Sequence, residues 1–142
     1  MRIAVGSDEA GAAPDAVIDE LGKRGHEVIA RGPLAGEAAR WADVARDVAA
    51  RVASGEANQG VLFCWTGTGV SIAANKLPGV RAALCGDAET ARGARAWNDA
   101  NVLCLSLRTA TPALAREILA AWLEAAPDGT EADQIARIEG AP

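Results

Sequence analysis

The chain has 142 residues, half of them apolar, which is enough to form a single domain over residues 1–142 around one hydrophobic core. Its formal net charge is −5 and its 14 Lys and Arg residues are scattered, which argues against a nucleic-acid or anionic-membrane partner, because both need clustered positive charge. No apolar run is long enough to span a bilayer, and the apolar stretch after Met1 is too short for a signal peptide, so we expect a cytoplasmic protein.

Short apolar runs alternate along the chain with segments of helical periodicity. In the first helical segment Val17, Ile18 and Leu21 fall on one face, and we expect Gly22 or Gly25 to end the helix. In chain order the patterns predict a strand at 2–6, a helix at 14–25, a strand at 26–30, a helix at 39–55, a strand at 60–65, a short helix at 70–76, a strand at 79–85, a helix at 87–97 capped by Asp87, a strand at 101–107, a helix at 111–125 capped by Thr111 with Pro112 at its first position, and a short helix at 130–140.

Strands that alternate with helices predict an α/β fold of three layers, in which helices cover both faces of a parallel sheet. In such sheets ligands bind beyond the carboxyl ends of the strands. The loops in which to look for a site are therefore residues 6–11, 64–69, 86–90 and 106–111.

The segment CWTGTG, residues 64–69, places a thiol in front of a glycine-rich turn. Such a turn leaves backbone N–H groups unpaired at the positive end of a helix, where they can hold a phosphate or a developing oxyanion. The alternative is a turn with only a structural role; the pattern matches neither the dinucleotide fingerprint nor a Walker loop. Cys64 could act there as a base or nucleophile, or it could be a small buried apolar residue. Cys85 and Cys104 lie inside apolar strands, and we expect both in the core.

Disulfide and metal chemistry are not expected. The three cysteines have no C-x-x-C spacing, so neither a disulfide framework nor a zinc site is predicted. His26 is the single histidine, which argues against a histidine-rich metal site. We expect no cofactor.

Three segments carry a resemblance to a known family: RIAVGSDEAG at the start, GVLFCWTGTGVSIAANK with PGVRAAL in the middle, and WNDANVLCLSLR after them. Over nearly its whole length the chain resembles the ribose-5-phosphate isomerase B and galactose-6-phosphate isomerase family. The resemblance implies a Rossmann-like fold with a five-stranded parallel sheet. It also implies homodimers or tetramers with active sites at subunit interfaces, which interconvert aldose and ketose phosphates through an enediolate without metal.

The resemblance assigns the catalytic roles. Cys64 is implied as the base that moves the proton between C1 and C2, and Thr66 as its assistant at the sugar oxygens. Some members use a glutamate in the following loop, but Val70 stands at that position here. Asn98 is implied to bind a hydroxyl or the carbonyl across the dimer.

The resemblance also assigns the contacts to substrate. Asp8 is implied to contact sugar hydroxyls, and Arg108 to point at the distal end of the substrate. The backbone amides from residue 67 to residue 71 are implied to hold the enediolate oxygen; these residues are Gly67, Thr68, Gly69, Val70 and Ser71.

The chain departs from the family pattern at several substrate-facing positions. Trp97 replaces a histidine that opens the sugar ring, Glu9 replaces a histidine near the phosphate, and Trp65 replaces a glycine. In the tail, Thr130 and Gln134 stand at the positions that align with two phosphate-binding arginines. Indole cannot carry a proton at neutral pH, and the loss of two arginines lowers affinity for a dianion.

These departures predict an altered substrate. Tryptophan faces stack on sugar C–H groups, so Trp41, Trp65 and Trp97 are candidates to shape the pocket, with simple packing as the alternative for each; Trp122 is expected in the core. One candidate substrate is a tetrose phosphate, which cannot close a stable ring. The other, favoured by the missing arginines, is an unphosphorylated or differently tailed hydroxycarbonyl compound, and ribose 5-phosphate comes third.

Two other classes of function stay open at this point. One is a non-catalytic paralogue that binds a sugar or another small molecule on the same scaffold. A plain nucleotide binder is less favoured, because no acidic ribose partner follows the glycine turn. The tail over 130–142 could reach a partner subunit.

Overall fold

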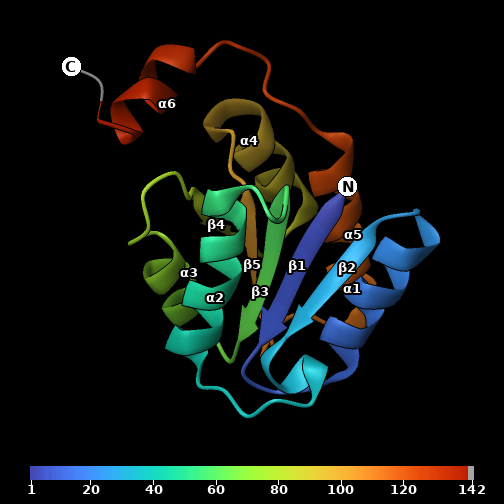
Figure 1. Cartoon of the computed structure of the whole chain (residues 1–142). Coiled ribbons are helices and arrows are strands. Elements are labelled where there is room, and N and C mark those ends of the chain that lie inside the picture. Colours follow the sequence, from blue (N-terminus) through green and yellow to red (C-terminus); the bar gives the residue numbers. More distant parts are fainter. Residues whose placement is uncertain (141–142) are drawn as a thin grey trace.

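The computed structural model describes residues 1–140, which form a five-stranded, all-parallel sheet in the strand order β2-β1-β3-β5-β4 (Figure 1). The Rossmann-like α/β fold expected from the sequence is confirmed. In chain order the elements are β1 (Arg2–Ser7), α1 (Ala12–Lys23), β2 (Glu27–Arg31), the 3-10 turn η1 (Gly32–Ala35), α2 (Trp41–Ser54), β3 (Gln59–Cys64), α3 (Thr68–Ala74), β4 (Ala82–Leu84), α4 (Ala88–Asn98), β5 (Val102–Ser106), α5 (Pro112–Glu124) and α6 (Ala132–Ile138).

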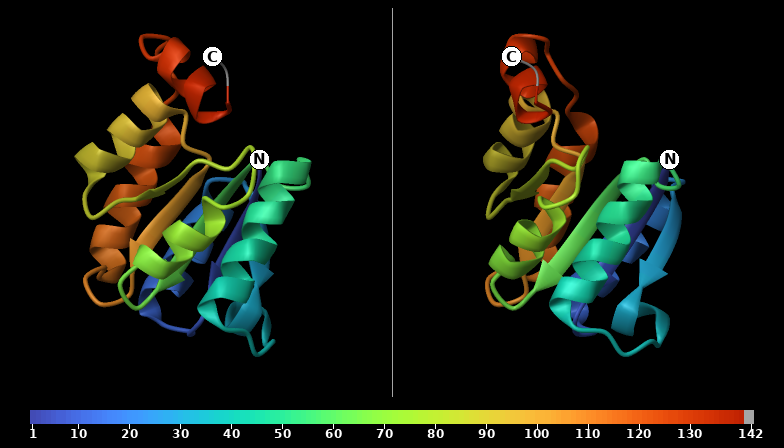
Figure 2. Two further views of the ribbon diagram at one scale, coloured as in Figure 1. Left: turned by 90° about the vertical axis from the view of Figure 1, so that its left-hand side faces the viewer. Right: turned by 60° about the vertical axis from the view of Figure 1, so that its left-hand side comes forward.

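Helices cover both faces of the sheet, as the continuous apolar strands require (Figures 1 and 2). Helices α1, α4 and α5 pack on one face and α2 and α3 on the other. Side chains of β5 alternate between the two cores: Leu103 and Leu105 join the first, whereas Val102 and Cys104 join the second. Trp122 lies in the first core, 1 % exposed, and its indole N–H donates to Gln59 at 2.9 Å, which confirms its expected place.

Most predicted elements are present with shifted ends. The helix predicted at 14–25 runs from Ala12 to Lys23; Gly22 lies inside it, and Gly25 follows its C-cap with a φ of +82°. The predicted caps are confirmed, because Asp87 accepts from the Thr90 N–H at 2.7 Å and Thr111 from the Leu114 N–H at 3.1 Å.

The strand predicted at 79–85 is wrong in extent, since only residues 82–84 pair with β5. The chain around its start is held by side chains as well as by the Arg81 carbonyl, which accepts from the Asn101 N–H at 2.9 Å. Asn101 accepts from the Arg81 N–H at 2.8 Å, and Asn75 accepts from the Ala82 N–H at 2.8 Å. The turn η1, which follows β2, was not predicted from the sequence.

The register brings the carboxyl ends of the three central strands together. Ser7 of β1 pairs with Phe63, and Cys64 pairs with Ser106 of β5. The loops that leave these three strands therefore meet at one edge of the sheet, opposite the edge where the amino terminus and α6 lie (Figure 1). Within residues 1–140, no helix combines the length and apolarity that a membrane crossing needs.

Candidate active site

Cys64 is the last residue of β3, and its thiol faces the layer of α2 and α3. The residue is 5 % exposed, so it is nearly buried but borders a cavity of about 260 Å³. The other residues that line this cavity are Asp8, Trp41, Trp65, Thr66, Thr68 and Gly69. Predicted site residues from two separate loops are thus brought together with the thiol.

The loop after β5 fixes the backbone on which the thiol sits. The Leu107 N–H donates to the Cys64 carbonyl at 2.9 Å, and the Arg108 N–H donates to the Trp65 carbonyl at 2.9 Å. The Ser106 hydroxyl donates to the same Trp65 carbonyl at 2.9 Å. The position of the sulfur is therefore set by the sheet and its loops, independently of the Trp65 side chain, which is 61 % exposed.

The turn after Cys64 can be made only by glycine at position 67. Gly67 has a φ of +76°, and a Cβ there would lie 2.6 Å from Leu84 Cδ1 and 3.0 Å from the Leu105 carbonyl carbon. The turn leads into α3, whose first N–H groups have no preceding helical turn to bind. Among the described residues, the N–H groups of Thr68, Gly69 and Val70 have no acceptor, and they can receive a negatively charged oxygen.

Two parts of the segment predicted to hold the enediolate oxygen, the Ser71 N–H and the Val70 side chain, do not offer a free donor to the cavity. The Ser71 N–H already donates to the Gly67 carbonyl at 3.3 Å, so within residues 67–71 it is engaged inside the helix. The Val70 side chain is fully buried in the second core, and only its backbone can face the cavity. The Thr66 and Thr68 hydroxyls form a hydrogen bond of 2.8 Å with each other.

Asp8, which lines the cavity, has a side-chain acceptor without a partner among residues 1–140. Its Oδ1 atom is buried, and no donor among the described residues reaches it. A buried carboxylate oxygen without a partner is costly, so this atom is suited to a ligand that donates a hydrogen bond. The indole of Trp41 lies against Gly69, where a Cβ would come within 2.9 Å of the ring, and it closes one side of the cavity.

A second cavity of about 350 Å³ adjoins the first and shares Thr66 with it. Arg108 lines it with an exposed side chain that has no ion-pair partner among residues 1–140. Cys85 also borders this cavity, but it is 1 % exposed, and burial together with the charge of Asp87 raises the pKa of its thiol to about 12. Burial likewise raises the pKa of the Cys104 thiol. The prediction that Cys85 and Cys104 are core residues is confirmed.

The predicted site residue Glu9, and the two tail residues that align with the phosphate-binding arginines, do not reach this cavity within one chain. Glu9 is exposed and does not line it; its N–H donates to the Ser7 hydroxyl at 3.2 Å, and that hydroxyl donates to the Glu9 carbonyl at 2.6 Å. Thr130 donates to Asp128 at 2.6 Å, and the Gln134 side chain donates to Asp133 at 3.3 Å, both at the edge of the sheet opposite Cys64. No cluster of three or more His, Cys, Asp or Glu in the part of the chain described here is placed to hold a metal ion.

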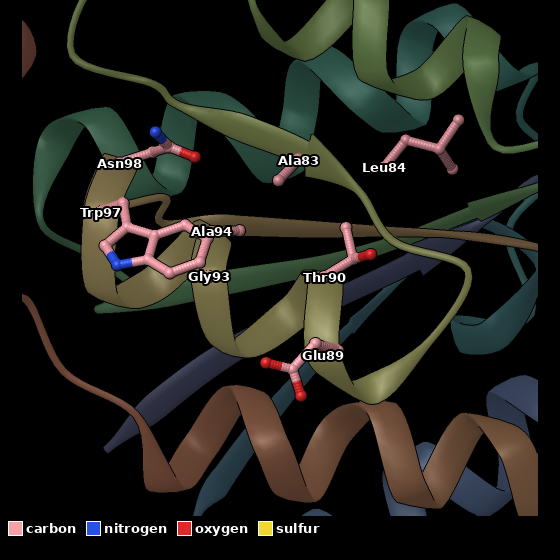
Figure 3. A pocket seen from close by; sticks show the side chains of 8 residues that line it. All are labelled: Ala83, Leu84, Glu89, Thr90, Gly93, Ala94, Trp97 and Asn98. Carbon is pink, nitrogen blue, oxygen red and sulfur yellow. The ribbon is translucent and has the colours of Figure 1, made fainter.

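Trp97 and Asn98 lie at the end of α4, in a separate groove of about 480 Å³ (Figure 3). Because α4 runs back along the sheet, its end faces the amino ends of the strands, away from Cys64. From Thr90 to Asn98 the helix axis rises by about 12 Å. A single chain therefore does not bring Asn98 to the thiol.

The polar residues of the motifs around residues 75–81 and 98–101 form a hydrogen-bonded network that was not predicted. Asp99 adopts a left-handed conformation with a φ of +45° at the end of α4. The Arg81 Nε donates to the Asp99 carbonyl at 2.8 Å, and Arg95 binds the Asp99 carboxylate at 3.1 Å and the Ala100 carbonyl at 2.6 Å. Arg81 also pairs with Glu139 after α6 at 2.5 Å. The signal in the sequence was the group of Asn, Arg and Asp residues itself, which serves to fix this corner.

The fold and this site define an α/β protein with a thiol-containing ligand cavity at the carboxyl edge of a parallel sheet. The family model for Ribose/Galactose Isomerase matches residues 3–139, and the chain belongs to this family. It is 40% identical over 129 residues to ribose-5-phosphate isomerase B of Escherichia coli, covering 90% of this chain and 87% of the relative. It is 39% identical over 132 residues to D-erythrulose-4-phosphate isomerase of Pectobacterium atrosepticum, covering 91% and 86%. The solved structure of Clostridium thermocellum ribose-5-phosphate isomerase B superimposes with a TM-score of 0.92 at 42% identity, covering 98% of this chain and 95% of that one.

Proposed function

We propose that the protein is an aldose–ketose isomerase that moves a proton between C1 and C2 of a sugar phosphate or related sugar. One observation carries the proposal: a single cavity combines the Cys64 thiol, the unpaired Asp8 oxygen and the free N–H groups of the turn into α3. A base, an acceptor for a hydroxyl and donors for an oxyanion are the parts that the reaction needs.

The reaction moves one proton from C2 to C1 by way of the base and a second proton from O2 to O1. The Cys64 sulfur, as a thiolate, takes the proton from C2 of the aldose, and the C–H electron pair forms the C1–C2 double bond while O1 gains the negative charge. The N–H groups of Thr68 and Gly69 stabilise that oxyanion. A proton passes from O2 to O1, assisted by the Thr66 hydroxyl, and the thiol returns its proton to C1, which leaves the carbonyl at C2 of the ketose.

A second copy of the chain is needed to complete this site. Asn98 lies at the far end of α4 from Cys64 in the same chain, so its proposed contact with a substrate hydroxyl must be made across a dimer interface. Exposed apolar side chains are present on both sides of the proposed contact: Trp65 is 61 % exposed near the thiol, and Trp97 is 53 % exposed beside Asn98. The assembly is a homodimer, or a tetramer built from two such dimers.

The substrate is proposed to enter in its open-chain form. His26 is the only histidine, and it lies at the edge of the sheet opposite Cys64, where its Nδ1 atom is 3.0 Å from the Met1 nitrogen. Within one chain the cavity therefore has no imidazole that could open a sugar ring. An unphosphorylated or differently tailed hydroxycarbonyl compound fits a neighbouring cavity whose lining includes one cation, Arg108. A tetrose 4-phosphate, which cannot cyclise, is the second candidate, and the similarity to D-erythrulose-4-phosphate isomerase supports it.

The experiment that tests the function is deuterium exchange followed by NMR. The protein is incubated in D2O with erythrose, erythrose 4-phosphate, ribose and ribose 5-phosphate. We expect deuterium next to the carbonyl of a four-carbon compound, and a loss of about 10²–10⁴-fold in Cys64→Ala, which is what a positioned general base contributes. Cys104→Ala, the same change on the same face of the neighbouring strand, is the control and keeps its exchange.

Mixing two inactive variants tests the shared site. Cys64→Ala and Asn98→Ala are each expected to be inactive, but a hybrid dimer contains one intact site. After random exchange of subunits, about a quarter of the wild-type activity returns. No recovery on mixing overturns the shared site, and no exchange by the wild type with any compound favours a non-catalytic sugar-binding protein.

A further inference from the structure

The middle of α4 contains a glycine that is covered by a tryptophan side chain. Gly93 is buried, and a Cβ built on it would lie 2.6 Å from Cζ3 and 2.9 Å from Cε3 of Trp97. Glycine in a helix interior is less stable than alanine, because it loses more backbone freedom on folding. Here the Trp97 indole occupies the space that a side chain at position 93 would fill. Gly93 lies one helical turn before Trp97 in α4 (Figure 3).

The backbone that carries Trp97 is fixed independently. Asp99 keeps its left-handed conformation because Arg81 and Arg95 bind its carbonyl and carboxylate. The Ala100 N–H closes the helix on the Ala94 carbonyl at 3.0 Å. With the backbone held by this network, the contact with Gly93 determines where the Trp97 ring lies.

The ring so placed keeps a free surface. Trp97 is 53 % exposed, and its indole borders the same groove as Leu84, Thr90 and Asn98. One side of the ring rests on Gly93 and the remainder is open, next to the amide that the proposed function assigns to the substrate. An indole face offers an apolar surface on which the C–H groups of a carbohydrate stack.

We infer that Gly93 is a positioning residue that holds Trp97 against α4, so that the indole forms an apolar wall for the carbon chain of a short, open-chain hydroxycarbonyl substrate. The inference rests on the proposed function, because the groove joins the thiol only in the assembly with a second copy. Any side chain at position 93 pushes the ring outward, into the space that the substrate occupies. Gly93 thereby limits which substrates fit.

A pair of identical substitutions separates this role from an ordinary effect on the helix. Gly93→Ala is compared with Gly22→Ala, because Gly22 also lies inside a helix but has no atom within 4 Å of its would-be Cβ. Both variants should keep or raise the melting temperature. We expect Gly93→Ala alone to raise the KM for the active compound among erythrose, erythrose 4-phosphate, ribose and ribose 5-phosphate by about fivefold to tenfold, which is the size of an aromatic contact, with little change in kcat.

Two further readouts show whether the effect passes through Trp97. In a Trp97→Ala background, Gly93→Ala should add nothing to the change in KM. In the ¹H–¹⁵N NMR spectrum, the indole N–H signal that disappears in Trp97→Ala should shift in Gly93→Ala and stay in place in Gly22→Ala. An unmoved indole signal overturns the positioning role, whether or not the protein turns over any compound. A moved signal with an unchanged KM overturns the role of the indole as a wall for the substrate. If the wild type exchanges deuterium with none of the compounds, the proposed function fails, and the indole wall for a substrate fails with it.

Discussion

The polar groups at the two edges of the sheet differ in how many of their hydrogen bonds are made within the chain. At the amino edge, Arg81, Arg95 and Asp99 bind one another and nearby carbonyls. At the carboxyl edge, the Asp8 Oδ1 and the first N–H groups of α3 have no partner within the described residues, although they lie beside a nearly buried thiol. At the amino edge most hydrogen-bonding groups of the network are used; the buried Arg95 Nε has no hydrogen-bond partner among the described residues, and the Arg95 guanidinium lies 5.6 Å from the Trp122 ring centroid. At the carboxyl edge the unpaired groups lie beside the cavity where a ligand is expected.

This contrast shows how a cluster of polar residues in a sequence should be interpreted. The Asn, Arg and Asp residues between 75 and 101 form a motif as distinctive as the thiol and its glycine turn. Most of them stabilise a corner of the fold, and only Asn98 is a candidate for contact with substrate. The two kinds of residue are separated by position, visible only in three dimensions: the unpaired Asp8 oxygen belongs to a residue that lines the cavity with the thiol, whereas the unpaired Arg95 Nε belongs to a side chain packed near Trp122.

The largest effect on stability is expected from Arg81→Ala. The side chain is 16 % exposed and binds Asp99 and Glu139. Its removal leaves a strained, left-handed Asp99 without its main support and should lower the free energy of unfolding by about 2–3 kcal/mol, measured in urea. Arg92→Ala removes an exposed pair with Glu89 and should cost less than about 0.5 kcal/mol. Equal losses in the two variants would falsify the role given to the network.

Asp8→Asn is expected to lower catalytic activity and to leave the free energy of unfolding nearly unchanged. The two side chains have the same shape, and the affected oxygen has no donor in the free protein. Loss of a charge-assisted hydrogen bond to substrate should lower kcat/KM by about 10- to 100-fold, with the urea midpoint nearly unchanged. Glu9→Gln, next in sequence but outside the cavity, is the matched control and should be neutral in both measurements. A stability loss in Asp8→Asn with normal activity would place Asp8 among the structural residues.

The smallest expected effect is on the melting temperature, and it concerns Asp87, which caps the first turn of α4. Hydrogen bonds from Thr90 lower the pKa of the Asp87 carboxyl, so its stabilising contribution is present above the usual aspartate pKa and is lost as the pH falls through the lowered value. Asp87→Ala should lower the melting temperature slightly at pH 7, and the difference from wild type should vanish in acid. Asp15→Ala, in the first turn of α1 where no side chain caps the helix, should show a smaller change at pH 7. A difference between Asp87→Ala and wild type that persists in acid contradicts the cap.

The sequence predicted the fold well because local signals and the global fold agree. The alternation of apolar runs with amphipathic segments, and the caps at Asp87 and Thr111, are properties of neighbouring residues. The extent of β4 was missed because Asn75 and Asn101, distant in sequence, bind the backbone that an apolar run alone would assign to a strand.

The site was predictable in part. Cys64, Thr66 and the glycine turn are contiguous, and Asp8 follows from its place after the first strand. Whether Trp41 or Trp97 lies near the thiol depends on how helices return across the sheet, and no local pattern contains that information. Trp41 lines the cavity through its contact with Gly69, whereas Trp97 lies on the far part of α4.

The three hydrogen bonds from the last residue of β5 and the loop after it to the carbonyls of Cys64 and Trp65 also affect how the protein can evolve. They hold the main chain and leave the Trp65 side chain free, so mutation can exchange that side chain while the sulfur stays in position. Selection can then act on the side chain at position 65 separately from the proton transfer proposed for Cys64. A scaffold arranged in this way can acquire new substrates by single substitutions, without passing through inactive variants.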